Sequence, residues 1–224
     1  DILDIEVVRG RISIPSVVSE VLEGNVGYVR LSQFEFSTSE AMRVALEEMN
    51  ANSLSGLILD VRGNPGGYLT TSIEVASAYL KDGVVLLERT PDNEVKHNAL
   101  RNAIAPDVPM VVLVDQGSAS ASELIAGALQ DNGRATIVGM PTFGKGSVQT
   151  WRQLSNGGGI RITISRWYTP NGNSVSDVGI LPDVEVPYSP AEVSGDEDNQ
   201  LAAAVQVLQG TYEPAQAASE PQTP

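Results

Sequence analysis

The chain has 224 residues, of which 42% are hydrophobic and 19% charged, the composition of an ordinary globular protein with one sizeable core. Its formal net charge of −14 argues against binding to nucleic acid or to anionic membrane surfaces, because both need clustered Lys and Arg side chains. Cysteine is absent, which excludes disulfides and thiolate metal sites, and no apolar run approaches the ~18 residues of a membrane span.

The first eight residues, DILDIEVV, alternate like a strand already under way, so we interpret the chain as cut from a longer precursor that carried any targeting segment. We assign residues 1–25 to a strand segment that enters the core and residues 26–190 to the core itself. Residues 191–224 are expected to hold a short helix at 199–208, followed by a small, polar and proline-bearing tail that is disordered.

Predicted strands and helices alternate through the first two thirds of the chain. Strands are expected at 26–31, 54–61, 84–88 and 110–114, and helices at 37–50, 71–80 and 120–132. Capping boxes open the first two helices, Ser37 with Glu40 and Thr71 with Glu74, and Gly133 closes the third helix. From residue 148 the pattern is that of strands, with an alternating segment at 159–168 and a turn at 170–172.

This alternation predicts a largely parallel sheet with covering helices. In such sheets, sites lie outside the carboxyl ends of the strands. Three loops follow apolar strands in that position, after Val61, after Val114 and after Val138. We therefore expect the glycine-rich turn at 62–67, the serine cluster at 117–123 and the loop at 139–147 to converge on one edge of the sheet.

Ser120 is the candidate nucleophile of the serine cluster. With Glu123 it forms a capping box at a helix start, and a helix cap alone is the simpler interpretation. The same position also suits catalysis, because free N–H groups and the positive end of the helix dipole gather there. The N–H of Ala121, with a second donor from Gly66, could hold an oxyanion. Ser118 and Ser122 are expected to make local hydrogen bonds.

Lys145 stands between two glycines and is one of only three lysines in the chain. Serine with lysine is an alternative to serine with histidine, and the only histidine, His97, lies in a polar stretch that we interpret as a solvated loop. A lysine amine accepts a proton only when it is uncharged, which requires that no carboxylate lies near it. Residues 138–154 contain no Asp or Glu, and Gln149 could orient the amine. A surface lysine in a hairpin is the alternative.

The segment GMPTFGK at 139–145 also matches the opening of a phosphate-binding loop. Gly146 then occupies the position at which Ser or Thr should bind magnesium, and the residues that follow predict a strand instead of a helix. His, Asp and Glu show no metal-ligand spacing. We therefore expect neither a nucleotide nor a metal, and no cofactor.

Four segments together resemble the carboxyl-terminal processing peptidases, also called tail-specific proteases: RGNPGG at 62–67, GSASASE at 117–123, PTFGKGSVQ at 141–149 and GILPD at 179–183. The resemblance runs from about Ile5 to Val186. It implies the α/β core of crotonase- and ClpP-like proteins, with a largely parallel sheet, covering helices and a β-rich C-terminal part. Carried over by position, it implies the following roles: Ser120 as nucleophile, Lys145 as general base, Gln149 as its orienting partner, and Gly66 and Ala121 as oxyanion donors.

The resemblance further implies a serine endopeptidase that cleaves proteins near their C-termini, outside the cytoplasm, in bacteria in the periplasm or cell envelope. Expected partners are protein or peptide substrates, and an activating adaptor protein and further copies of the full-length protein in a homo-oligomer are candidate partners. Binding to nucleic acid and insertion of this segment into a membrane are not expected. The PDZ domain that family members carry just upstream is not in the sequence. Two alternatives stay open: a catalytically idle peptide-binding or scaffolding relative, and an acyl-CoA enzyme of the crotonase fold.

Overall fold

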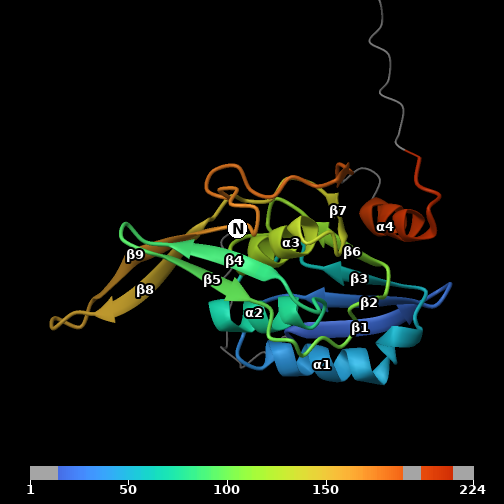
Figure 1. Ribbon diagram of the computed structural model, residues 1–224, viewed down its shortest axis with the longest axis horizontal. Coiled ribbons are helices and arrows are strands. Elements are labelled where there is room, and N and C mark those ends of the chain that lie inside the picture. Colours follow the sequence, from blue (N-terminus) through green and yellow to red (C-terminus); the bar gives the residue numbers. More distant parts are fainter. Residues whose placement is uncertain (1–14, 189–197, 214–224) are drawn as a thin grey trace, which may run out of the picture.

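The computed structural model describes residues 15–188 and 198–213, which form two β-sheets and their covering helices (Figure 1). The predicted strand at the start of the chain and the predicted disordered tail from residue 214 lie outside the described residues. The strands are β1 Val17–Leu22, β2 Val26–Leu31, β3 Gly56–Asp60, β4 Val84–Arg89, β5 Glu94–Asn98, β6 Met110–Val114, β7 Thr136–Gly139, β8 Ser147–Gln153, β9 Gly159–Tyr168 and β10 Val184–Glu185. The helices are α1 Thr38–Glu48, η1 Ala51–Ser53, α2 Leu69–Ser77, α3 Ala121–Asp131 and α4 Asn199–Gln209.

The larger sheet has six strands in the order β1-β2-β3-β6-β7-β10. All neighbours are parallel except β1, which pairs antiparallel with β2 at one edge. Strands β3 and β6 are buried along their whole length, because both faces of a parallel sheet carry helices and their sequences are almost continuously apolar. The predicted parallel sheet is therefore confirmed.

Helices cover both faces of this sheet (Figure 1). On one face, Leu46 of α1, Val75 of α2 and Leu124 of α3 pack into the main hydrophobic core. On the other face, α4 packs Ala203 and Ala204 against strand residues that include Tyr28, Ile58, Val111, Leu113 and Val138. The predicted C-terminal helix thus docks on the sheet as part of the fold.

The second sheet is antiparallel, with the strand order β5-β4-β9-β8. Strands β8 and β9 form a long hairpin that projects from the rest of the molecule (Figure 1). The hairpin leaves β8 as an outer strand of this sheet, and most of its side chains are exposed. This sheet is the predicted β-rich part, although β4 and β5 of the middle of the chain also belong to it.

The two predicted capping boxes at the first helices are wrong. Ser37 has helical backbone angles and makes no side-chain cap bond, and Glu40 pairs instead with Arg43 on the surface of α1. Helix α2 begins at Leu69, so Thr71 lies inside its first turn. Glu74 accepts a hydrogen bond from Ser39 of α1. A contact within α1 replaces the first cap, and a contact between α1 and α2 replaces the second.

His97 does not lie in a loop, as the polar sequence suggested, but in the edge strand β5. Its Nε2 atom lies 2.9 Å from a carboxylate oxygen of Glu88 on the neighbouring strand β4. The pKa of Glu88 is lowered, chiefly by the hydrogen bond from Ser165 and further by His97. The histidine therefore supports the second sheet and lies away from the residues that line the cleft described below.

Candidate active site

The three predicted loops converge at the carboxyl ends of β3, β6 and β7. Asp115 after β6 accepts a hydrogen bond from the N–H of Gly63 in the glycine turn (2.8 Å), and Ser118 donates its hydroxyl to the carbonyl of Val61 (2.8 Å). The N–H of Phe143, in the loop after β7, donates to the carbonyl of Ser118 (3.0 Å). Every pair of adjacent loops is thus tied directly, and the predicted edge of the sheet is confirmed.

Ser120 occupies the residue before α3 with φ of 54° and ψ of −109°, a backbone conformation that L-residues adopt rarely and at a cost. Two contacts hold the turn in place. The N–H of Ser120 donates to Glu123 (2.7 Å), and the N–H of Ala119 donates to the carbonyl of Asn64 (3.0 Å). A sharp turn before a helix presents a serine hydroxyl at the helix start, in the manner of a nucleophile elbow.

The other serines of the cluster are structural, as predicted. Ser122 donates its hydroxyl to the carbonyl of Asn64 (2.9 Å), and Ser118 bonds to β3 as described above. Both side chains are fully buried, whereas Ser120 keeps part of its surface exposed. Among the serines of this cluster, only Ser120 is therefore accessible to a substrate.

Gly66 lies directly against Ser120. A Cβ atom at Gly66, whose φ is +104°, would come within 2.9 Å of Ser120 Cβ and 3.0 Å of Ala121 N, so only glycine fits this approach. Ala121 is the first residue of α3, and its N–H has no partner within the helix. The two predicted oxyanion residues therefore meet beside Ser120.

The N–H of Gly66 already has an acceptor, because it donates to the side-chain oxygen of buried Asn64 (2.9 Å). The neighbouring N–H of Gly67 has no recorded hydrogen-bond acceptor in the described part of the chain, and Gly67 lines the cleft in front of Ser120. Asn64 was not among the candidate residues. Its side chain orders the glycine turn by bridging Gly66 to the carbonyl of Leu31.

Glu123 joins the serine turn to the lysine loop. Its fully buried carboxylate accepts hydrogen bonds from four groups. One oxygen accepts from the N–H groups of Ser120 (2.7 Å) and Lys145 (2.9 Å), and the other from the N–H of Gly144 (2.5 Å) and the hydroxyl of Thr142 (2.7 Å). The sequence predicts only a helix-capping role for Glu123, and the structure adds the link to the lysine loop.

The expectation that no carboxylate lies near Lys145 is wrong, because it considered only the neighbouring residues in the sequence. Residues 138–154 contain no acid, but the fold brings Glu123 of α3 against the backbone of Lys145. The recorded contacts of Glu123 go to backbone N–H groups and to one hydroxyl, and the described residues form no ion pair with the Lys145 amine. The carboxylate thus holds the loop without binding its amine.

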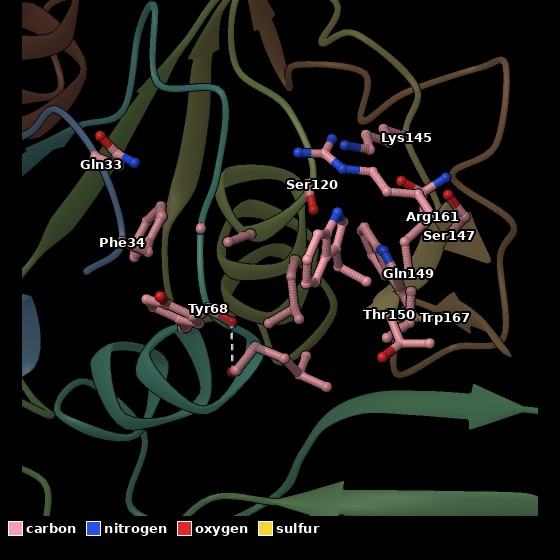
Figure 2. A pocket seen from close by; sticks show the side chains of 17 residues that line it. Gln33, Phe34, Tyr68, Ser120, Lys145, Ser147, Gln149, Thr150, Arg161 and Trp167 are labelled. Carbon is pink, nitrogen blue, oxygen red and sulfur yellow. Dashed lines mark hydrogen bonds between the residues drawn. The ribbon is translucent and has the colours of Figure 1, made fainter. Parts of the chain in front are cut away.

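A cleft of about 570 Å³ opens in front of Ser120 (Figure 2). Ser120 stands at the start of α3, Tyr68 lies near the start of α2, and Lys145 and Gln149 come from the side of β8. The cleft is lined by Gln33, Phe34, Gly67, Tyr68, Leu69, Ser72, Ser120, Ala121, Leu124, Lys145, Ser147, Val148, Gln149, Thr150, Trp151, Arg161 and Trp167. The predicted nucleophile, base and orienting residue therefore share one cavity.

No hydrogen bond joins the Ser120 hydroxyl to the Lys145 amine in the described residues. Gln149 donates instead to the hydroxyl of Thr163 on β9, at the long distance of 3.5 Å. Catalytic hydrogen bonds are often loose in structures without substrate. The structure thus brings the two side chains into one cleft without a direct hydrogen bond between them.

A buried ion network supports the glycine turn from behind. Arg62 binds Asp60 at the end of β3 (2.7 Å) and Asp198 at the start of α4 (2.6 Å). Burial alone would raise the pKa of Asp198, but hydrogen bonds from Arg62 and from the N–H of Leu201 outweigh it and hold that pKa below the usual range. Burial beside Asp60 raises the pKa of Tyr28 to about 12. The docking of α4 is thereby tied to the site.

The phosphate-loop alternative does not fit the structure. The loop at 140–146 runs into strand β8, so no helix N-terminus follows Lys145 to hold a phosphate. Within residues 15–188 and 198–213, no group of three His, Cys, Asp or Glu side chains could hold a metal ion. None of the helices in these residues is long and apolar enough to cross a membrane.

Comparison with known proteins identifies the family of the chain. The sequence profile of Peptidase family S41 matches residues 25–186. The chain is 42% identical over 189 residues to a carboxyl-terminal-processing protease of Synechocystis sp., covering 83% of this chain and 44% of that protein. It is 37% identical over 191 residues to the chloroplastic carboxyl-terminal-processing peptidase 2 of Arabidopsis thaliana, covering 81% and 37%.

Among solved structures, the photosystem II D1 C-terminal processing protease superposes with a TM-score of 0.73 at 35% identity, over 80% of this chain and 50% of that one. The chain belongs to peptidase family S41, with the carboxyl-terminal-processing serine proteases. It spans less than half the length of the curated relatives named here. The resemblance seen in four short segments is therefore confirmed, together with the α/β fold that it implied.

Proposed function

We propose that the chain is the catalytic core of a serine endopeptidase that uses a Ser120–Lys145 pair to cleave protein substrates at or near their C-termini. The proposal rests on one observation. The same cleft is lined by Ser120, whose backbone is strained at the start of a helix, and by Lys145, which comes from a separate loop. Family membership supports the peptidase class.

In this mechanism the uncharged Lys145 amine removes the proton from Ser120 as its oxygen attacks a peptide carbonyl. The N–H of Ala121 and an N–H of the segment Gly66–Gly67 stabilise the negative charge on the carbonyl oxygen. Because the Gly66 N–H is bound to Asn64, the second donor is Gly67 or a Gly66 released from that bond. Lys145 returns the proton to the leaving amine, and water then hydrolyses the acyl-enzyme with the lysine again as base.

The substrate is proposed to lie extended along β8. That strand is at the outer edge of its sheet, and its residues 147–151 line the cleft. An edge strand can bind a peptide backbone as an added strand, while side-chain pockets select residues. Gln149, which projects into this cleft, is proposed to orient the lysine amine once substrate is bound.

We further propose that the whole protein acts outside the cytoplasm, in the periplasm or cell envelope, on protein substrates and under the control of an adaptor protein or of self-assembly. Similar proteins of bacteria and chloroplasts are carboxyl-terminal-processing proteases, which supports such a location. Fractionation of cells that express the full-length protein tests the location directly.

The catalytic proposal is tested by digestion of casein with the full-length protein, followed on gels and by mass spectrometry. Ser120→Ala should abolish cleavage while the unfolding midpoint in urea stays close to that of the wild type. Lys145→Arg keeps the positive charge and cannot act as base, so it should be inactive as well, whereas Lys96→Arg on the edge strand β5 should behave like the wild type.

Full activity of either Ser120→Ala or Lys145→Arg would refute the dyad. If wild type and Ser120→Ala bind peptides equally and neither cleaves them, the catalytically idle relative replaces the peptidase.

A further inference from the structure

The charge of the cleft is opposite to the charge of the protein. The chain carries 28 acidic and 14 basic residues, yet the 17 residues that line the cleft include two cations, Lys145 and Arg161, and no Asp or Glu. The whole stretch 132–176 contains no acid. A cavity of one sign in a protein of the other sign indicates selection for a ligand charge at that place.

Of the two cations, only Arg161 is free to hold an anion. Lys145 must be uncharged to act as a base, whereas a guanidinium keeps its charge in proteins and has no acceptor atoms. Arg161 lies on β9 directly opposite Trp151 of β8. In Figure 2 its side chain extends from β9 toward the part of the cleft where Ser120 and Lys145 are drawn.

Arg161 has no protein acceptor in the described residues. Arg43, Arg62, Arg89 and Arg134 all donate to carboxylates or to backbone carbonyls. Arg101, Arg152 and Arg166 lack an acceptor in these residues as Arg161 does, but of these four arginines only Arg161 lines the cleft. No hydrogen bond or ion pair is recorded for the Arg161 guanidinium in the same residues, although it lines a cavity with room for a ligand. A guanidinium with five unused donors matches the two oxygens of a carboxylate in a bidentate arrangement.

We infer that Arg161 forms an anion subsite of the cleft and binds a carboxylate of the substrate peptide while Ser120 attacks the scissile carbonyl. This inference rests on the proposed peptidase function. The carboxylate has two possible sources, the free α-carboxylate of a nearby C-terminus or an acidic side chain. Either one fixes the distance between an anionic group and the bond that is cut, because Arg161 and Ser120 belong to one cavity.

The net charge of −14 affects which substrate positions should prefer a carboxylate. At physiological ionic strength, charge interactions between exposed groups fall off over about 8 Å, so the acidic surface repels anionic peptides weakly and without positional preference. Only a carboxylate placed at Arg161 meets a fixed positive charge in the cleft. The preference should therefore appear at one substrate position, and carboxylates elsewhere in the peptide should bring no gain.

The test uses one fluorescent peptide that the full-length protein cleaves or, if none is cleaved, one derived from its own C-terminal sequence. Versions carry a free acid or an amide at the C-terminus, and Glu or Gln at each interior position in turn. Binding is measured by anisotropy with the Ser120→Ala protein, both alone and combined with Arg161→Gln, Arg161→Lys or Arg152→Gln. Arg152 is the matched control, because it lies on the same hairpin and does not line the cleft.

With Arg161 present, one carboxylate should raise affinity about tenfold over its neutral counterpart, and kcat/KM of the active enzyme should follow the same ratio. Arg161→Gln should bring that ratio to about one, Arg161→Lys should retain part of it, and Arg152→Gln all of it. Loss of the ratio on amidation identifies the α-carboxylate as the ligand, and loss on a Glu-to-Gln change identifies a side chain.

A ratio that survives Arg161→Gln, a ratio of one in the wild type, or failure of every peptide to bind would overturn the anion subsite. Binding with the expected ratio but without turnover refutes the peptidase proposal and leaves the subsite standing. Turnover without any preference for a carboxylate refutes the anion subsite and leaves the peptidase proposal standing.

Discussion

Replacing Glu123 by Gln should both destabilise the protein and slow catalysis. The substitution keeps the shape of the side chain and exchanges one acceptor oxygen for an NH2 group, which donates. In the native protein each carboxylate oxygen accepts two hydrogen bonds, so one pair of donors must lose its acceptor. If the amide takes the place of the oxygen that Ser120 and Lys145 share, the N–H groups of these two residues face another donor.

The loss can be estimated from these contacts. A hydrogen bond to a charged group contributes about 1.5–3 kcal/mol, so the loss of two at a fully buried site should lower the free energy of unfolding by about 3–6 kcal/mol. Domains of this kind are stable by only about 5–15 kcal/mol. The variant should therefore unfold at a much lower urea concentration, with the same dependence on urea if the denatured state is unchanged.

Catalysis should suffer beyond the loss of folded protein. In that orientation the lost hydrogen bonds hold the backbones of Ser120 and Lys145, the proposed nucleophile and base, and displacement by about 1 Å can slow an oriented reaction on the order of 100-fold. Under conditions in which Glu123→Gln is still folded, kcat should fall far more than KM rises. Glu40→Gln, on the exposed face of α1, is the control and should change neither quantity.

The assays are urea unfolding followed by the fluorescence of the buried Trp167, and peptide cleavage on samples shown to be folded by circular dichroism. A Glu123→Gln variant within 1 kcal/mol of the wild type and equal in kcat would show that the four hydrogen bonds do not hold the two loops together. A stable but slow variant would instead separate the positioning effect from the stabilising one.

Two further substitutions test the strain and the ion network around the site. Ser120→Gly should be more stable than Ser120→Ala by about 1 kcal/mol in urea unfolding, because glycine adopts φ of +54° without the penalty of a Cβ atom, and equal midpoints would argue against strain at this turn. Asp198→Asn should cost about 1 kcal/mol at pH 7, a value reduced for its partial exposure. Because folding lowers the pKa of Asp198, its contribution to the free energy of unfolding is complete above about pH 3.9 and disappears as the pH falls through the folded-state pKa. The difference in stability between Asp198→Asn and the wild type should therefore shrink in acid. A difference that stays constant between pH 7 and about pH 3 would contradict the assignment.

The buried strands and the converging loops could be predicted because their signals are local. Residues 54–61 are almost continuously apolar, as a strand covered on both faces must be, and Gly133 follows α3 with the left-handed φ of +62° expected there. Strand β5 could not be predicted in this way. Its sequence, EVKHN, has no buried face at the sheet edge, so no apolar alternation marks it, and the turn-forming residues 91–93 before it, PDN, were the one local signal.

The two predicted capping boxes fail for a different reason, because other side chains bind their acidic residues. Glu40 and Glu74 stand at capping-box spacing, but each finds a partner on α1, Arg43 and Ser39 respectively. Arg161 escaped notice because its strand alternates Arg and Thr with isoleucine, which reads as an ordinary exposed face. Its distance in the chain from Ser120 and Lys145 hid the shared cleft, although the acid-free sequence around it was a usable signal.

Ser120 and Lys145, the proposed nucleophile and base, belong to parts of the chain that pack on different sheets, and the buried Glu123 carboxylate joins them. Ser120 begins a helix that packs on the parallel sheet, whereas Lys145 leads into β8 of the antiparallel hairpin. The packing of either sheet alone cannot set their separation, so a direct tie is needed. Glu123 supplies it through N–H groups of both residues, and because it binds backbone it holds the lysine loop in place while leaving the amine to face the cleft.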